Sequence, residues 1–184
     1  MLDLENAIRR SRIESSPYEF KQGVVRLDVD RTDDPTIFSV IVETLCGIAN
    51  VGPDADGNLF LGVADKKADS DRIIQLDAVA PILLSDHYVV GIDREARLRG
   101  RSLDQYVQKV VAEIQASALC EPLKTHVLGG IDTITLQGLT VLRILVPRQK
   151  ALSFVGDRAF LRQGSSTIEL TGQQLVAASK RFPT

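Results

Sequence analysis

Residues 32–65 read TDDPTIFSVIVETLCGIANVGPDADGNLFLGVAD, and they predict a helix followed by a buried strand. Apolar residues recur at helical spacing through 32–50, Pro35 suits a first helical turn, and either aspartate just before it can cap the helix. The apolar run at 58–65, bounded by turn residues, is typical of a buried strand.

The flanking sequence extends this pattern to a strand, a helix and a strand, because YEFKQGVVRLD at 18–28 alternates and is rich in β-branched and aromatic residues. Further helices are predicted at 2–12, 70–84 (broken by Pro81), 102–119 and 171–181. Further strands are predicted at 87–93, 123–129, 131–138 and 139–147, and a last strand and loop within 158–170. We therefore expect one α+β domain over 1–184, with about four helices around a mixed, mainly antiparallel sheet.

The composition is that of an ordinary globular protein, with 44% hydrophobic and 25% charged residues over 184 positions. No apolar run reaches the roughly 20 residues that span a bilayer, and the start of the chain lacks the apolar segment of a signal peptide, so we expect a cytoplasmic protein. Cys46 and Cys120 lack ligand-spaced neighbours and are expected to be buried thiols. The net charge of -2 does not suggest a general polyanion binder, so any such site must be local.

Three carboxylates stand where they could meet at one end of two neighbouring strands. Glu14 precedes the first predicted strand, Glu19 lies within it, and Asp65 ends the strand at 58–65. Such a trio would bind Mg²⁺ or Mn²⁺, which prefer carboxylate and water oxygens and can activate water at a phosphoryl centre. The alternative is that the three acids are exposed strand ends.

Four short motifs in order, ESSPYEFK, VETLCGIAN, LFLGVAD and FLRQGSS, span residues 14–166. Together they resemble the Schlafen AlbA-type domain, whose pattern has an ES-x-x-x-EFK start, a helix ending in asparagine, a G-V-D-D strand end and a late R-x-G-S-S segment. The resemblance implies an AlbA-like fold and nucleic-acid binding.

The resemblance also implies roles for individual residues. In the ribonuclease members of that family, three acids at the positions of Glu14, Glu19 and Asp65 form a metal-dependent endoribonuclease site for structured RNA. Catalysis by this trio with Mg²⁺ or Mn²⁺, and RNA rather than DNA as the partner, are therefore the expectations here. Lys21 and Asn50 match family positions that suit phosphate contacts or support of the acids.

The RQGSS segment is expected to expose Arg162, Ser165 and Ser166 to a phosphate. Arg158 lies four residues before Arg162, so the two would share one face of a strand and form a local basic patch. The alternative is a β-turn stabilised by its serine side chains.

Two departures from the family pattern weigh against catalysis. The loop NVGPDADGN is longer than the family's turn, and Ala64 replaces the first of two aspartates at the strand end. The family's ribonucleases also join two lobes, which a homodimer of this chain could rebuild. A non-catalytic nucleic-acid-binding module, or a regulatory or interaction module, is therefore the alternative to an endonuclease.

Overall fold

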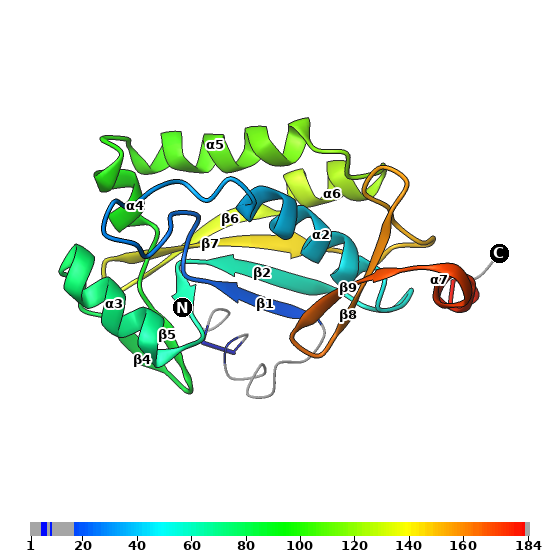
Figure 1. Ribbon diagram of the computed structural model, residues 1–184, viewed down its shortest axis with the longest axis horizontal. Helices are drawn as coiled ribbons and strands as arrows, with labels where there is room; N and C mark the ends of the chain where they lie inside the picture. Colours follow the sequence, from blue (N-terminus) through cyan, green and yellow to red (C-terminus); the bar gives the residue numbers. More distant parts are fainter. Residues whose placement is uncertain (1–4, 7, 9–16, 183–184) are drawn as a thin grey trace.

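The computed structural model describes residues 5, 6, 8 and 17–182 (Figure 1). This part of the chain contains six helices and nine strands. The strands are β1 (Tyr18–Lys21), β2 (Gly57–Leu61), β3 (Val63–Ala64), β4 (Ile82–Leu84), β5 (His87–Val89), β6 (Ile131–Leu136), β7 (Leu139–Val146), β8 (Ala159–Gln163) and β9 (Ser166–Leu170). The helices are α2 (Ile37–Ala49), α3 (Lys67–Asp77), α4 (Asp93–Leu98), α5 (Leu103–Ala116), α6 (Leu123–Gly129) and α7 (Gly172–Ser179).

The main sheet has the strand order β1-β2-β7-β6. β1 and β2 are parallel, with Glu19 opposite Leu59, and the other neighbours are antiparallel. The parallel pair requires a crossover connection, and α2 supplies it. The expected α+β domain with a mixed sheet is confirmed, and the strand, helix and strand at its start are present.

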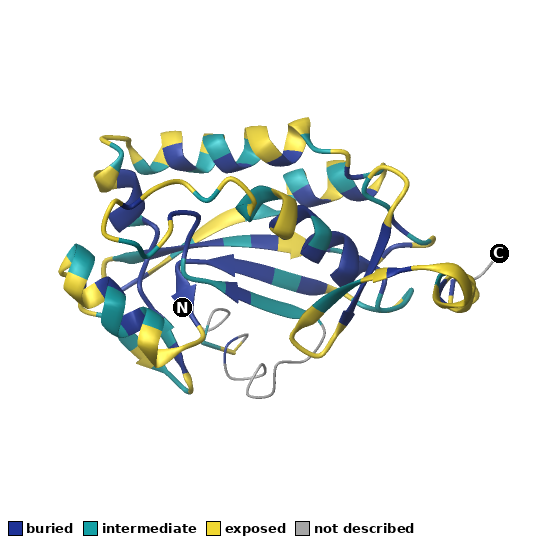
Figure 2. Cartoon of the chain, viewed as in Figure 1, coloured by how far each residue is buried: buried dark blue, intermediate teal, exposed yellow. Residues whose placement is uncertain are grey.

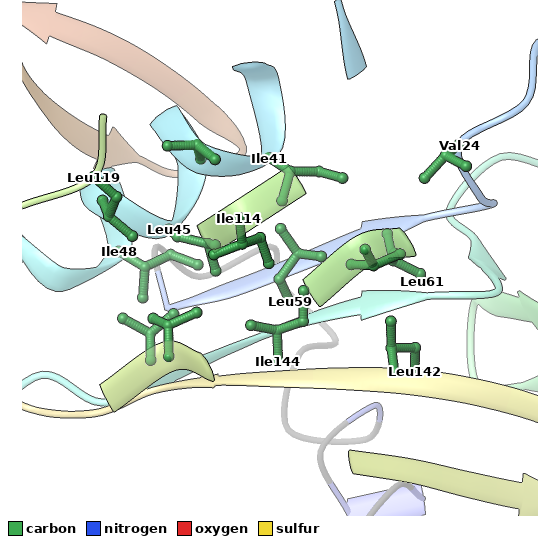
Figure 3. Close-up of a cluster of buried hydrophobic side chains, with 14 of the residues drawn as sticks. Val24, Ile41, Leu45, Ile48, Leu59, Leu61, Ile114, Leu119, Leu142 and Ile144 are labelled. Atoms are coloured by element: carbon green, nitrogen blue, oxygen red, sulfur yellow. The ribbon is translucent and has the colours of Figure 1, made fainter. Parts of the chain in front are cut away.

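Helices α2, α5 and α6 cover one face of this sheet (Figure 1). Ile41, Leu45 and Ile48 of α2 are fully buried and face Leu59 of β2 and Ile144 of β7 (Figure 3). The outer side of α5 is exposed and its inner side is buried (Figure 2), as expected for an amphipathic helix. Burial of these aliphatic side chains stabilises the fold by about 25 cal/mol per Å² of apolar surface.

The opposite face of the sheet carries a second apolar cluster that includes Phe20 of β1 and Phe60 of β2. Their rings stack with centroids 5.4 Å apart. Because side chains alternate along a strand, Phe20 faces this cluster while its neighbours Glu19 and Lys21 point to the other side of β1. This alternation sets the direction of the Glu19 carboxylate.

The expected single sheet is wrong, because two smaller sheets accompany the main one: β3-β5-β4 and the hairpin of β8 and β9. The strand predicted at 58–65 is divided at Gly62, whose φ of 98° suits glycine. Its carbonyl accepts hydrogen bonds from the N–H groups of Val90 and Gly91, at 2.9 and 3.0 Å. The chain therefore leaves β2 at Gly62 and continues in another sheet.

The strand predicted at 123–129 is also wrong, since these residues form helix α6. Leu123 and Val127 are its buried residues, four positions apart, which is a helical repeat. Seven residues are too few for periodicity to separate a helix from a strand. α4 was not predicted, and the count of six helices exceeds the expected four.

The predicted helix starts differ in how well they match the structure. Ser102 caps α5 as predicted, and it forms a capping box with Gln105. α2 begins at Ile37, and Asp34 accepts hydrogen bonds from the N–H and the hydroxyl of Thr36 in the turn before it. Of the helix predicted at 2–12, only residues 5, 6 and 8 lie within the described part.

No described helix has the length and apolar character needed to cross a membrane.

A buried polar network lies beneath the segment that follows β1. The fully buried Glu95 of α4 accepts hydrogen bonds from the N–H groups of Val24 and Val25, at 2.9 and 3.1 Å, and from the hydroxyl of Tyr106 at 2.7 Å. A Cβ atom at Gly23 would lie 2.0 Å from the Glu95 carboxylate, so only glycine fits there. This network fixes the chain just beyond Lys21.

The two cysteines should differ strongly in reactivity. Burial raises the pKa of the Cys46 thiol from 9.0 to about 12, which lowers its thiolate fraction at about pH 8 by roughly a thousandfold. Cys120 is half-buried. We expect one thiol to react quickly with a thiol reagent in the folded protein, both to react in urea, and Cys120→Ser to abolish the fast phase. Fast reaction of folded Cys120→Ser protein would contradict the burial of Cys46.

Candidate nucleic-acid interface

A pocket of about 260 Å³ lies between β1, the end of β3 and the tip of the β8–β9 hairpin. Its lining residues are Tyr18, Glu19, Phe20, Asp65, Lys66 and Ser165. They come from three segments far apart in the sequence. The parallel pairing of β1 with β2 and the break at Gly62 bring the first two together, and Arg162 of β8 binds Tyr18 and Glu19 of β1. Two of the three predicted acids therefore line one pocket.

Glu19 is held by two cations. Its Oε1 accepts a hydrogen bond from Lys21 Nζ at 2.9 Å, and its Oε2 lies 2.8 Å from a guanidinium nitrogen of Arg162. The Glu19 side chain is only 14% exposed. Both oxygens of this carboxylate are thus neutralised by neighbouring positive charge.

Arg162 of β8 is buried, with its side chain 3% exposed. Besides Glu19, it donates to the carbonyl oxygens of Ser165 and Tyr18, at 2.7 and 3.2 Å, and to the Thr167 hydroxyl at 3.3 Å. These bonds tie the hairpin tip to β1, beside which the hairpin lies (Figure 1). Arg162 therefore sets the distance between Glu19 and Ser165 and is not itself open to a ligand from solvent.

Asp65 and Lys66 are exposed and immediately precede α3. Lys66 is the N-cap position of this helix, and its side chain makes no capping hydrogen bond. The N-terminal end of a helix carries partial positive charge and free N–H groups. Lys66 and the start of α3 therefore add positive potential to the pocket beside the Asp65 carboxylate.

The other predicted site residues lie in different environments. Lys21 pairs with Glu19 and is 18% exposed, and Ser165 and Ser166 are exposed at the hairpin tip, where only Ser165 lines the pocket. Glu14 lies outside the described residues.

Asn50 is fully buried at the end of α2. Its amide donates to the carbonyl oxygens of Ser153 and Phe160, at 2.9 and 2.8 Å, and its Oδ1 accepts the N–H of Ser153 at 2.7 Å. These bonds hold the 153–160 segment in place. Because Asn50 is buried, its side chain cannot contact a ligand at the surface.

Arg158 precedes β8 and is exposed, so it does not share an exposed face with the buried Arg162. It pairs with Glu169 at 2.7 Å and Glu43 at 3.3 Å. The hydrogen bond between Arg158 and Glu169 raises the pKa of Arg158 and lowers the pKa of Glu169. The basic patch expected from these two arginines is not formed.

The carboxylates that line this pocket provide only part of the ligand set that a divalent cation needs. Among the described residues, no three histidine, cysteine, aspartate or glutamate side chains are grouped so as to hold a metal ion. Asp65 offers an exposed carboxylate, whereas both oxygens of Glu19 are bound by cations. The described residues alone therefore do not make a metal site.

Sequence reasoning missed Tyr18, Phe20 and Lys66 as pocket residues. All three are direct neighbours of predicted acids, Lys66 of Asp65 and the other two of Glu19. Lys66 directly follows the predicted strand end and begins a run of charged residues. This position is the sequence feature that could have identified it as a pocket residue. The backbone carbonyl of Tyr18 binds Arg162, a contact that no local pattern indicates.

The sequence matches no protein-family model and no curated protein. The fold is similar to a crystal structure of the DIP2311 protein from Corynebacterium diphtheriae, with a TM-score of 0.50 and 14% sequence identity. The match covers 92% of this chain and 28% of that chain, so this chain spans less than a third of that protein's length. At this identity the similarity concerns the fold alone.

Proposed function

We propose that the pocket lined by Glu19, Asp65, Lys66 and Ser165 binds the phosphodiester backbone of a nucleic acid, with RNA favoured over DNA. The observation that carries the proposal is the joining of these four side chains, from three distant segments, in one pocket. The preference for RNA comes from the resemblance to the Schlafen AlbA-type domain.

The local charges support an anionic ligand despite the acidic composition. Lys21 and Arg162 neutralise Glu19, while Lys66 forms no ion pair within the described part of the chain. Lysine side chains, hydroxyl groups and helix N-termini are common phosphate contacts in nucleic-acid complexes. The Ser165 hydroxyl and the start of α3 border the same space.

Metal-dependent endonuclease activity is the second candidate, favoured by the shared pocket of Glu19 and Asp65. Glu14 would have to join them to complete the acidic trio that the resemblance implies. Mg²⁺ or Mn²⁺ is the cation that such oxygen ligands would take.

Replacing Lys66 with glutamine is expected to weaken RNA binding on the order of fivefold and to reduce the salt slope of log Kd by nearly 1, since one phosphate contact is lost. Fluorescence anisotropy with a labelled hairpin RNA over a range of salt concentrations measures both. Lys67→Gln is the matched control, because Lys67 is the next residue and pairs with Asp71. Equal effects of the two substitutions, or no binding at low salt by the wild type, would overturn the proposal.

Cleavage is tested separately with the same RNA in Mn²⁺, Mg²⁺ or EDTA, and with Asp65→Asn protein. An endonuclease should cut only with the divalent cation, and Asp65→Asn should retain RNA binding while losing cleavage. Binding that persists in EDTA, without cleavage of RNA or single-stranded DNA by the wild type, would identify a non-catalytic binding module.

A further inference from the structure

A second pocket, of about 360 Å³, lies between the start of α6 and the segment that follows β7. It shares no lining residue with the Glu19 pocket. One wall holds Cys120, Pro122 and His126, and the other is formed by the chain from Arg148 to Ser153. Its volume lies at the lower end of the roughly 300–1,000 Å³ found for small-molecule sites.

Both walls of this pocket are fixed by buried hydrogen bonds. Asn50 Oδ1 accepts a hydrogen bond from the backbone N–H of Ser153 at 2.7 Å, while the backbone N–H of Cys120 donates to the Phe154 carbonyl at 2.9 Å. The Gln149 side chain is buried and donates to the carbonyl of Arg148 at 3.0 Å. The site is therefore held open by the fold before any ligand arrives, which reduces the ordering cost of binding.

The rim of the pocket is cationic. Arg148 and Lys150 are exposed, and neither forms an ion pair with a carboxylate in the described part of the chain. The single acid in the lining, Glu121, accepts a hydrogen bond from the N–H of Thr125 at 3.1 Å, and hydrogen bonding to Thr125 lowers the pKa of its carboxyl. Two positive charges thus face one negative charge on a chain whose net charge is -2.

Part of the remaining lining is apolar. Pro122, Ala151 and Leu152 contribute aliphatic surface next to the cations. A pocket with two unpaired cations and an apolar wall suits an anionic group attached to a small organic body. Arginine is well matched to phosphate because its planar guanidinium can donate two parallel hydrogen bonds.

We propose that this second pocket binds a phosphate group, with Arg148 and Lys150 contacting its oxygens and the Pro122 and Leu152 side of the pocket receiving the organic part of the ligand. The phosphate would come either from a free nucleotide or from a strand of nucleic acid. This inference does not depend on the function proposed for the Glu19 pocket.

Amide chemical shifts measured by NMR on the full chain test it, with adenosine monophosphate and a short single-stranded RNA as separate probes. We expect saturable shifts at Gln149–Ser153 with at least one probe. The Arg148→Gln/Lys150→Gln double variant should weaken that binding about tenfold or more. Arg97→Gln/Arg101→Gln is the charge-matched control and should leave the affinity within about twofold, since these exposed arginines lie outside the pocket lining.

The two probes distinguish the source of the phosphate. Saturation by the nucleotide identifies a free ligand, and saturation by RNA alone identifies a strand. Lys66→Gln should leave these shifts unchanged, so a failure of the Glu19 pocket and a failure of this one are separable. The proposal is overturned if neither probe gives saturable shifts at Gln149–Ser153, or if the control weakens binding as much as the double variant does.

Discussion

Replacing Arg162 with methionine is expected to lower the free energy of unfolding by about 3 kcal/mol, because it removes one partner of a buried ion pair. Arg162 is nearly inaccessible and binds Glu19, Tyr18 and Ser165 at once. Breaking such a pair costs about 3–5 kcal/mol when the remaining charge is stranded. Glu19 keeps Lys21 as a partner and is 14% exposed, which places the expected cost at the lower end.

Urea unfolding of the variants measures this effect, with Arg158→Met as a matched control. Arg158 lies on the same hairpin and also pairs with carboxylates, but it is about half exposed, and exposed pairs contribute roughly 0–1 kcal/mol. Arg162→Lys keeps the charge yet cannot reproduce the guanidinium bonds, so it should recover only part of the loss. Equal costs for Arg162→Met and Arg158→Met would show that Arg162 does not organise the hairpin.

The same variant connects stability with the site. Without the Arg162 bonds to Tyr18 and Ser165, the hairpin tip is no longer fixed against β1. RNA binding at the Glu19 pocket should then weaken more in Arg162→Met than in Lys66→Gln protein, measured where both variants are folded. Arg162 thus acts as a positioning residue, although the RQGSS motif suggested a direct phosphate contact.

Local sequence predicts elements well where the apolar pattern is long. The helix through Ile37–Ala49, the Ser102 cap of α5 and the β6 and β7 strands all follow from periodicity or capping chemistry. Helix α6 does not follow from the sequence pattern, because its seven residues are too few to distinguish a helical from a strand periodicity. Gly62 likewise divides a predicted strand, because its carbonyl accepts hydrogen bonds from the N–H groups of Val90 and Gly91. These partners are distant in sequence, so no local pattern indicates the break.

The site residues show a similar limit. The sequence places Glu19 within the first strand and Asp65 at the end of its neighbour, and the two do line one pocket. It also suggests that Arg162 is exposed, whereas its side chain is buried in an ion pair with Glu19. Because Glu19 is distant in sequence, no local pattern indicates this pair. One signal was available: Gly47 in the last turn of α2, where a Cβ would lie 3.3 Å from the Arg162 side chain, leaves room for that arginine.

Glu95→Gln is expected to destabilise the protein more than Arg162→Met does, by about 3–5 kcal/mol out of a total of roughly 5–15 kcal/mol for a domain of ordinary stability. The Glu95 carboxylate is fully buried and receives hydrogen bonds from Val24, Val25 and Tyr106. It also lies 3.1 Å from a guanidinium nitrogen of Arg94, itself buried. A glutamine places an amide nitrogen against these donors and removes the charge that offsets Arg94.

Arg94 does not become wholly unpaired in this variant, because it also contacts Asp77 at 3.0 Å. Asp77 in turn forms an ion pair with Arg31, so one carboxylate would serve two buried guanidinium groups. That surplus of positive charge, together with whichever N–H group of Val24 or Val25 then faces the glutamine NH2 instead of an oxygen, is the physical reason for a cost above that of a single hydrogen bond.

Urea unfolding with Glu113→Gln as the control tests this prediction, since Glu113 is exposed on α5 and its change should cost less than about 0.5 kcal/mol. Tyr106→Phe removes one hydrogen bond to the carboxylate and should cost about 1.5–3 kcal/mol. In the Glu95→Gln background that cost should shrink, because the charged acceptor is already gone. Additive costs in this cycle, or a loss below about 1 kcal/mol for Glu95→Gln, would mean that the segment after β1 is held chiefly by its apolar contacts rather than by the Glu95 carboxylate.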